Sequence, residues 1–335
     1  MKKYWLSKPF IDVTFILAPP FLCLFLIFLF QDKLEDIAEK YSFVNWLLFI
    51  VFIDVAHVYS TLYKTYFNPK ERQKFKGLLI KLPLISLLSG VVLYGIGSHF
   101  FWSVLAYIAV YHFIRQQYGF MRLYARFEEK KTSRLDALAI YNATLFPMMY
   151  WFLSSKRQFT WFVEEEFFTF NCPTCLKFLE VLYGLILLTY IAIVVFNYIK
   201  YNQFNLQKNV LILGTYLSWY FGIVYFNNDL IFTILNVVSH GVPYIALIYV
   251  NQKEESHVSF FPRLKTIQGL LVFLVLILGL AFSEELLWEF TVWNEQIQFH
   301  PFENPFEKWQ IILVPLLTVP QLTHYLLDGF IWKNK

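Results

Sequence analysis

Residues 309–331 read WQIILVPLLTVPQLTHYLLDGFI, an apolar run that contains two ionisable side chains one helical turn apart, His324 and Asp328. A helix needs roughly 20 mostly apolar residues to cross the hydrocarbon core of a bilayer, and this run is long enough. Ionisable side chains within such a span are rare and usually face the bundle interior or a water-filled cavity. The run therefore predicts a membrane-spanning helix that contributes to a buried polar site.

The composition of the whole chain agrees with this prediction. Of its 335 residues, 58% are hydrophobic and only 16% are charged, whereas a soluble domain carries about 25% charged residues. The chain also contains 38 phenylalanines and 22 tyrosines, which would be hard to bury in one water-soluble core. The composition predicts an all-α fold, a polytopic transmembrane helical bundle, and argues against a water-soluble protein.

Ten apolar segments approach the length of a membrane span. The first is too long for the apolar region of a signal peptide, and no small-residue cleavage site follows it. We see no internal repeat and no Gly/Ser-rich linker, so we expect a single domain over residues 1–335. The predicted spans are residues 10–30, 43–63, 77–97, 100–121, 136–154, 177–198, 209–226, 230–250, 267–283 and 309–331.

The loops between these spans alternate in charge. The N-terminus and the loops at 64–76 and 122–135 are basic, whereas the loops at 31–42 and 283–308 are acidic. Short basic loops stay on the cytoplasmic side of a membrane. The pattern predicts that both termini are cytoplasmic, and it makes the formal net charge of +4 a sign of membrane orientation. No nucleic-acid partner is expected.

The cysteines point to one disulfide. Cys172 and Cys175 form a single Cys-x-x-Cys motif in a loop that the charge pattern places outside. A zinc site would need more such ligands, and no thioredoxin-like βαβ pattern surrounds the motif. A structural disulfide is the favoured interpretation over a redox motif. Cys23 lies inside the first span and is expected to be a buried thiol.

Four of the seven histidines lie inside predicted spans, namely His57, His112, His240 and His324. The four spans run in the same direction, and each histidine precedes the cytoplasmic end of its span by seven to eleven residues. At 1.5 Å per residue, this places all four imidazoles roughly 10–17 Å from the cytoplasmic boundary. We expect them to share one layer and to form one metal site. The remaining histidines, His99, His257 and His300, fall in loops or at span ends.

Each of the four histidines has polar neighbours on its own helix face. Residues three, four or seven apart lie on one side of a helix. Pro243 is also expected to leave the main-chain carbonyl of Ser239 without its usual helical donor. The four polar sets are Asp54, His57 and Thr61; His112, Arg115, Gln116 and Gly119; Asn236, His240 and Tyr244; and Gln321, His324 and Asp328.

Five of these side chains are candidate catalytic residues: Asp54, Arg115, Gln116, Tyr244 and Asp328. The two aspartates either hold a histidine ring of a neighbouring helix, as carboxylates around metal sites do, or ligate the metal directly. Arg115 needs a counter-ion at this depth, for which Asp54 and Asp328 are the candidates, or it binds a carboxylate or phosphate of the substrate.

The donor set limits the choice of cofactor. The layer has no thiolate, which argues against copper–thiolate and iron–sulfur centres, whereas imidazoles with optional carboxylates suit iron, copper or zinc. Iron bound by four imidazoles keeps positions open for dioxygen, which suits the oxidation of an apolar substrate dissolved in the bilayer. We therefore favour a single iron ion, although a two-metal site remains an alternative.

Four sequence blocks carry a resemblance to known proteins: DVAHVYSTLYKTYFNPKERQ, YHFIRQQYGFMRLY, SHGVPY and THYLLDGFIWK. Together they resemble a group of bacterial polytopic membrane proteins, which implies a location in the bacterial inner membrane. The chain is also loosely similar to membrane β-carotene dioxygenases of the Brp/Blh type, which hold iron with intramembrane histidines. That likeness implies an iron oxygenase. The chain lacks the aspartate expected after the His-Gly element and lacks a close His-x-x-x-His pair.

The favoured function is thus a membrane metal-dependent oxidoreductase that acts on a lipid or isoprenoid and receives electrons from a donor. Two alternatives use the same histidines. In a b-type haem protein they are axial ligands, and in a transporter or proton pathway they form a relay. A structural scaffold would leave the polar layer unexplained.

Overall fold

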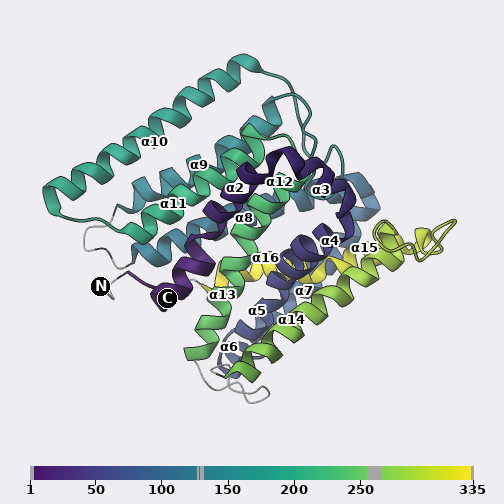
Figure 1. The fold of residues 1–335 in the computed structure, drawn as a ribbon. Helices are drawn as coiled ribbons and strands as arrows, with labels where there is room; N and C mark the ends of the chain where they lie inside the picture. Colours follow the sequence, from purple (N-terminus) through teal and green to yellow (C-terminus); the bar gives the residue numbers. More distant parts are fainter. Residues whose placement is uncertain (1–3, 127, 129–131, 255–265, 333–335) are drawn as a thin grey trace. The chain divides into compact units, whose positions relative to one another are not determined.

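The computed structural model describes residues 4–126, 128, 132–254 and 266–332. All regular elements of these residues are helices, which confirms the predicted all-α fold (Figure 1). Among the described residues, six helices are long and apolar enough to cross a membrane, and a bent helix pair at the N-terminus is a seventh candidate. His257, predicted to lie in a loop or at a span end, falls outside the described residues.

Each of the ten predicted spans coincides with a helix or with consecutive helical segments. The first is interrupted, because the stretch Pro9–Leu17 and the stretch Pro19–Lys33 meet at an angle of 51°. Pro19 and Pro20 lie at this bend, and a proline cannot donate the main-chain hydrogen bond that a continuous helix requires. The sequence thus predicts the positions of the helices well, and it misses the bend.

The chain forms two compact units. The first unit consists of Met1–Leu34 and Ala109–Pro243, and the second consists of Glu35–Ile108 and Tyr244–Lys335. Three helices, α3 (Leu34–Lys40), α8 (Ser98–Ala125) and α13 (Ser239–Glu254), contribute residues to both. The predicted single domain stays a prediction.

The first unit contains the N-terminal segment and the middle of the chain. Besides its parts of α3, α8 and α13, its helical elements are α1 (Pro9–Ile11), η1 (Asp12–Leu17), α2 (Pro19–Phe30), η2 (Gln31–Lys33), α9 (Ser133–Leu153), α10 (Pro173–Tyr201), α11 (Leu206–Trp219), η4 (Tyr220–Tyr225), α12 (Asp229–Thr233) and η5 (Ile234–Val238).

Within the first unit, α9 packs against both α10 and α11, and α11 also packs against α2. The long helix α10 lies beside α9 in Figure 1. Asn205 caps α11 by accepting a hydrogen bond from the main-chain N–H of Lys208 at 3.1 Å, and its amide donates to the carbonyl of Tyr124 at 3.1 Å. Cys172 and Cys175 form a disulfide at the start of α10, which confirms the predicted bond.

The second unit contains the remaining helices. Besides its parts of α3, α8 and α13, these are α4 (Ser42–Asn45), η3 (Trp46–Val55), α5 (Ala56–Lys64), α6 (Pro69–Lys74), α7 (Lys76–Ile96), α14 (Ile267–Trp288), η6 (Glu289–Trp293), η7 (Glu307–Trp309), α15 (Gln310–Leu317) and α16 (Val319–Ile331).

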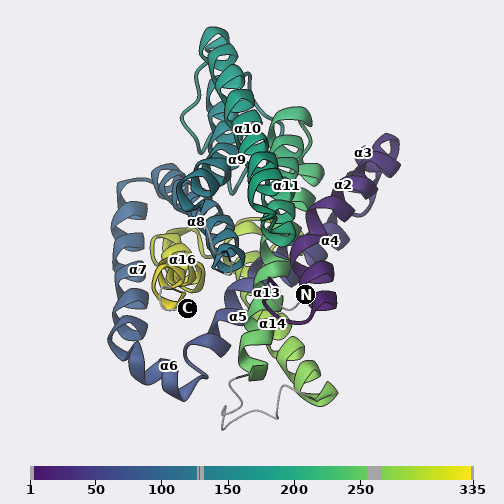
Figure 2. The same cartoon turned by 90° about the vertical axis from the view of Figure 1, so that its left-hand side faces the viewer.

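A hydrophobic core joins three parts of the second unit. Val51 of η3, Tyr244 and Ile248 of α13, and Phe273 and Ile277 of α14 pack together and are fully buried or nearly so. On the other side of the unit, α7 packs against α15 and α16, and Figure 2 shows α7 running beside α16. The core fixes η3 and α14 relative to the helix that carries Tyr244.

Wide helical turns precede two of the four intramembrane histidines. The π-helical segment η3 leads directly into α5, which carries His57, and the π-helical segment η5 leads directly into α13, which carries His240. Such wide turns are rare and occur frequently at functional sites. The apolar periodicity of the sequence does not reveal them.

The predicted ninth span is too short. The sequence suggested that it ends at residue 283, whereas α14 continues to Trp288 and the helical stretch reaches Trp293. Glu284, Glu285 and Glu289 therefore belong to a candidate membrane span, Ile267–Trp293, and not to an acidic loop. The first charged residues were wrongly taken as the end of the apolar segment.

Candidate functional site

The four intramembrane histidines are all buried. Their exposed fractions are 1% for His57, 3% for His112, 1% for His240 and 1% for His324. Within the second unit His57 lies beside His324, and within the first unit His112 lies beside His240. The prediction that all four share one layer stays a prediction.

The pair in the second unit consists of His57 on α5 and His324 on α16. Their ring centroids are 4.9 Å apart, the rings are inclined by 81°, and each ring offers a nitrogen within 4.8 Å of one on the other ring. The helices α5 and α16 pack directly against each other. Two imidazoles at this distance can hold one metal ion with a modest adjustment of their side chains, since zinc–nitrogen bonds are about 2.0–2.1 Å long.

A chain of hydrogen bonds leads away from His324. Its Nδ1 lies 2.7 Å from the hydroxyl of Thr61, which lies 3.1 Å from the hydroxyl of Tyr244. The hydroxyl of Tyr244 lies 2.5 Å from Oδ1 of Asp328. The chain thus links α5, α13 and α16 within the second unit.

The protonation state of Asp328 sets which group donates and which accepts in each hydrogen bond of this chain. If Asp328 is ionised it only accepts, so that Tyr244 donates to it and the Tyr244 oxygen can accept from Thr61. Thr61 then accepts from Nδ1–H of His324. In this tautomer Nε2 carries the lone pair with which an imidazole binds a metal. This assignment follows from the network, because hydrogen positions are inferred from hydrogen-bond partners.

The two aspartates of the predicted site take different places. Oδ1 of Asp54 lies 3.5 Å from Nδ1 of His57, a residue of its own helical stretch and not of a neighbouring helix. Asp328 is linked to His324 through Tyr244 and Thr61. Both aspartates are thus connected to a histidine of their own helical stretch, Asp54 to His57 and Asp328 to His324. Their predicted roles, holding the ring of a neighbouring helix or ligating the metal, stay predictions.

The pair in the first unit consists of His112 on α8 and His240 on α13. Their ring centroids are 5.1 Å apart with the rings inclined by 79°. One face of the His240 ring is covered by Phe113, whose ring lies parallel to it at 3.6 Å. Trp161 contacts the same phenylalanine edge-on, at 5.0 Å. The imidazole of His240 thus has an aromatic wall that fixes its plane.

Two glutamines of α8 bind the main chain around His240. The amide of Gln116 donates to the carbonyl of His240 at 2.8 Å, and the amide of Gln117 donates to the carbonyl of Ser239 at 3.3 Å. Pro243 removes the usual helical donor of the Ser239 carbonyl, as predicted, and Gln117 replaces it. The oxygen of Gln117 accepts from Thr215 on α11 at 3.2 Å. Sequence spacing drew attention to Gln116 and missed Gln117.

Arg115 lies on the other side of α8. It is exposed, whereas His112 and Gln116 are buried. Its guanidinium donates to the hydroxyl of Tyr141 at 2.6 Å and lies 4.7 Å from the ring centroid of Tyr118. The argument that Arg115 requires a buried carboxylate as counter-ion therefore does not apply to its position. Its predicted catalytic role stays a prediction.

The second unit also contains buried carboxylates that the sequence analysis placed in a loop. Glu284 and Glu285 of α14 are both buried, and Glu284 accepts a hydrogen bond from the hydroxyl of Tyr59 on α5. The indole of Trp288 donates to the other oxygen of Glu284 at 3.4 Å. Tyr59 lies two residues after His57 on the same helix, so this acidic pair approaches the histidine-bearing segment of α5.

Glu289, one turn further along, has a structural role. One of its oxygens accepts three main-chain N–H groups, from Glu295 at 2.8 Å, Gln296 at 2.8 Å and Ile297 at 3.0 Å. It thus orders the chain that follows the helix.

Comparison with known proteins finds no relative of this chain: no family model matches it, and neither does any curated protein or solved structure. The likeness to bacterial membrane proteins and to membrane β-carotene dioxygenases stays a prediction from the sequence. The functional argument therefore depends on the geometry of the site.

Proposed function

We propose that the protein is a membrane-embedded, metal-dependent oxidoreductase that holds non-haem iron with imidazole ligands and acts on a lipid or isoprenoid. The observation that carries the proposal is the pair His57 and His324, two buried imidazoles whose nitrogens approach within 4.8 Å on adjacent helices. Burying ionisable side chains within membrane helices costs free energy, and such side chains usually mark functional sites.

The residues around the pair fit a bound metal ion. Thr61 holds the ring of His324 in the tautomer whose Nε2 can act as a ligand, and Asp54 stands beside Nδ1 of His57. Partners of this kind orient the ligands of metal sites and raise their basicity. Iron bound here would supply redox chemistry with dioxygen. The proposal keeps His112 and His240 as the two further ligands that the sequence predicts, with Gln116, Arg115, Tyr244 and the two aspartates as candidate catalytic residues.

The pair geometry favours non-haem metal over haem. Two axial imidazoles bind a haem iron from opposite sides with bonds of about 2 Å, which puts their ring centroids about 6 Å apart. The observed separations of 4.9 Å and 5.1 Å are shorter than this, and the rings in each pair are nearly perpendicular.

The proposal includes a membrane setting. We infer ten spans with both termini in the cytoplasm, in the inner membrane of a bacterium. Support comes from the alternation of loop charges and from helices at all ten predicted positions. An apolar substrate would enter from the lipid, and an electron donor would supply reducing equivalents.

A proton pathway is the second candidate, and Glu284 is the observation that favours it. A carboxyl group hydrogen-bonded to Tyr59 inside a candidate span is a typical part of a proton relay. In that case Glu284, Tyr59 and the histidines would pass protons without any metal.

One experiment separates these functions. The purified protein is assayed for bound metals and for its absorption spectrum. Stoichiometric iron without a haem Soret band is the expected result, and His57→Ala and His324→Ala should each lose most of it. His99→Ala is the matched control, because His99 is an exposed histidine at the start of α8. A metal-free wild-type protein would favour the proton pathway, and a Soret band would identify haem.

A further inference from the structure

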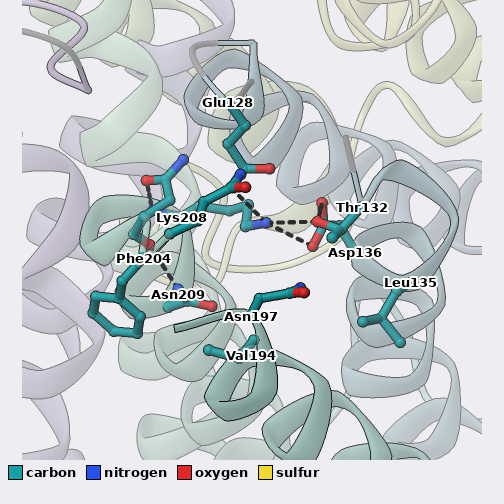
Figure 3. A pocket seen from close by; sticks show the side chains of 11 residues that line it. Glu128, Thr132, Leu135, Asp136, Val194, Asn197, Phe204, Lys208 and Asn209 are labelled. Carbon is teal, nitrogen blue, oxygen red and sulfur yellow. Dashed lines mark hydrogen bonds and ion pairs between the residues drawn. The ribbon is translucent and has the colours of Figure 1, made fainter. Parts of the chain in front are cut away.

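A small cavity lies in the first unit, and neither His112 nor His240 lines it. Its volume is about 20 Å³. It is formed where α9 begins, where α10 ends and where α11 begins, together with Glu128, which follows α8. Figure 3 shows Glu128, Asp136 and Lys208 gathered on one side of it, with Asn197 and Val194 opposite.

The ammonium group of Lys208, beside this cavity, has a partner for each of its three N–H donors. Its ammonium lies 2.7 Å from Glu128, 2.8 Å from Asp136 and 3.0 Å from the hydroxyl of Thr132 (Figure 3). An ammonium group has three N–H donors, and these three oxygens use all of them. The second oxygen of Asp136 accepts from Thr132 at 2.8 Å. Lys208 and Asp136 therefore satisfy each other, with the help of Thr132.

Glu128 is left with an unused oxygen. Its side chain is 3% exposed, and its Oε2 is buried without a hydrogen-bond partner among the described residues. The three ionisable groups carry two negative charges and one positive charge, so the cluster has a formal net charge of −1. A buried carboxylate with an unsatisfied oxygen is costly, and this oxygen belongs to a residue that lines the cavity.

Amide side chains supply further oxygens around the same cavity. Asn197, Asn205 and Asn209 line it. The hydroxyl of Tyr190 donates to Oδ1 of Asn209 at 2.7 Å, and the main-chain N–H of Lys208 donates to Oδ1 of Asn205 at 3.1 Å. Both amides are thus held in place, and each carbonyl oxygen retains a second lone pair.

The geometry points to a binding site for one compact monovalent cation between Glu128 and the amide of Asn197. A cavity needs roughly 10–15 Å³ to hold one water-sized group, so this one has room for a single such group. Because the cluster has a net negative charge and the cavity is lined by oxygen acceptors, it favours a cation. Na⁺ or the primary ammonium of a phospholipid headgroup would fit this description. The helix ends around the cavity coincide with predicted span ends, and the proposed topology would put them at the depth of the headgroups. This site does not depend on the proposed oxidoreductase function.

The test measures the thermal unfolding midpoint of the purified full-length protein. One arm titrates NaCl against N-methyl-D-glucamine chloride at constant ionic strength. The other arm compares the protein in nanodiscs of phosphatidylethanolamine with the protein in nanodiscs of phosphatidylcholine. Phosphatidylcholine is the negative control, because its quaternary ammonium is too bulky for the cavity. Because a ligand that binds only the folded protein stabilises it by mass action, we expect the midpoint to rise and saturate in one arm. The responding arm identifies the source of the cation.

Two variants tie the effect to this cavity. Glu128→Gln removes the negative charge and should weaken the apparent affinity for the cation at least tenfold, and Asn197→Ala should weaken it without disturbing Lys208. Glu164→Gln is the control, because Glu164 is an exposed glutamate paired with Lys156. If Glu128→Gln fails to fold, the response of the unfolding midpoint of Asn197→Ala to the cation tests the site by itself. The inference is overturned if wild type responds in neither arm, or if its response is unchanged in Asn197→Ala and in folded Glu128→Gln.

Discussion

Thr61 on α5 and His324 on α16 are joined by a hydrogen bond of 2.7 Å between the threonine hydroxyl and Nδ1 of the imidazole. The same hydroxyl lies 3.1 Å from Tyr244, so Thr61 connects a candidate metal ligand to a chain that ends at Asp328. A β-branched side chain has few rotamers in a helix. Thr61 is therefore well suited to hold the ring of His324 in one orientation and one tautomer.

Replacement of Thr61 tests this connection. Thr61→Val keeps the shape of the side chain and removes the hydroxyl, so we expect metal affinity to fall by about 10–100-fold, the usual effect of losing a partner of a metal ligand. Thr61→Ser keeps the hydroxyl and should retain most of the metal. The measurement is the metal content after dialysis against a graded series of chelator concentrations.

The control for this variant is Thr189→Val on α10. Thr189 is exposed, and its hydroxyl bonds only the carbonyl of Leu185 on its own helix, at 2.7 Å. Equal metal content in Thr61→Val and wild type would show that Thr61 does not orient a ligand.

The sequence predicts single-helix features of the site better than contacts between helices. Pro243 and the freed carbonyl of Ser239 follow from the covalent chemistry of proline, and the structure supplies Gln117 as the donor. The burial of His57 and His324 follows from their place in apolar runs. Which histidines pair with each other depends on which helices are neighbours, and depth along a span contains no information about that.

Two errors have a common physical origin. Arg115 was placed on the face of His112 because the two lie three positions apart, yet Arg115 is exposed and donates a hydrogen bond to Tyr141. Glu284 was placed in a loop because it is charged, yet it is buried and bonds Tyr59. In both cases a tyrosine from another helix forms the hydrogen bond that stabilises the charged side chain. The periodicity of residues along one helix cannot predict a partner on another helix.

The disulfide between Cys172 and Cys175 leads to a prediction about chemical reactivity. In intact membranes both thiols should resist a maleimide reagent until a reductant is added, because a bonded cysteine has no thiolate. Cys23 is buried in the N-terminal segment and should stay unlabelled in both conditions. Mass spectrometry of the peptide around Pro173 reads out the result, and labelling of both cysteines before reduction would contradict the bond.

The ends of α9 test the proposed topology. Arg134 lies at the start of this helix and Glu165 lies in the loop after it. If α9 crosses the membrane with basic loops inside, a cysteine introduced at position 134 should be protected from an impermeant reagent in whole cells, and one at position 165 should be labelled. Disrupted cells, in which both positions should react, provide the control. Labelling of both positions in whole cells would overturn the ten-span map.

The contact between α11 and α2 leads to a prediction about stability. A Cβ atom added at Gly214 would lie 2.7 Å from Cγ of Pro20 and 3.3 Å from the ring of Phe21. The proline ring is rigid, so Gly214→Ala must push the two helices apart. Overpacking of this kind typically costs 1–3 kcal/mol, and we expect about that loss in the free energy of unfolding.

The matched control for this variant is Gly184→Ala in α10, where an added Cβ atom meets nothing within 4 Å. Alanine is the better helix former by up to about 1 kcal/mol, so this variant should be as stable as wild type or slightly more stable. Thermal unfolding of both variants in the same detergent gives the comparison. Equal midpoints for Gly214→Ala and Gly184→Ala would mean that α2 and α11 are not in close contact, and the packing of the first unit would have to be revised.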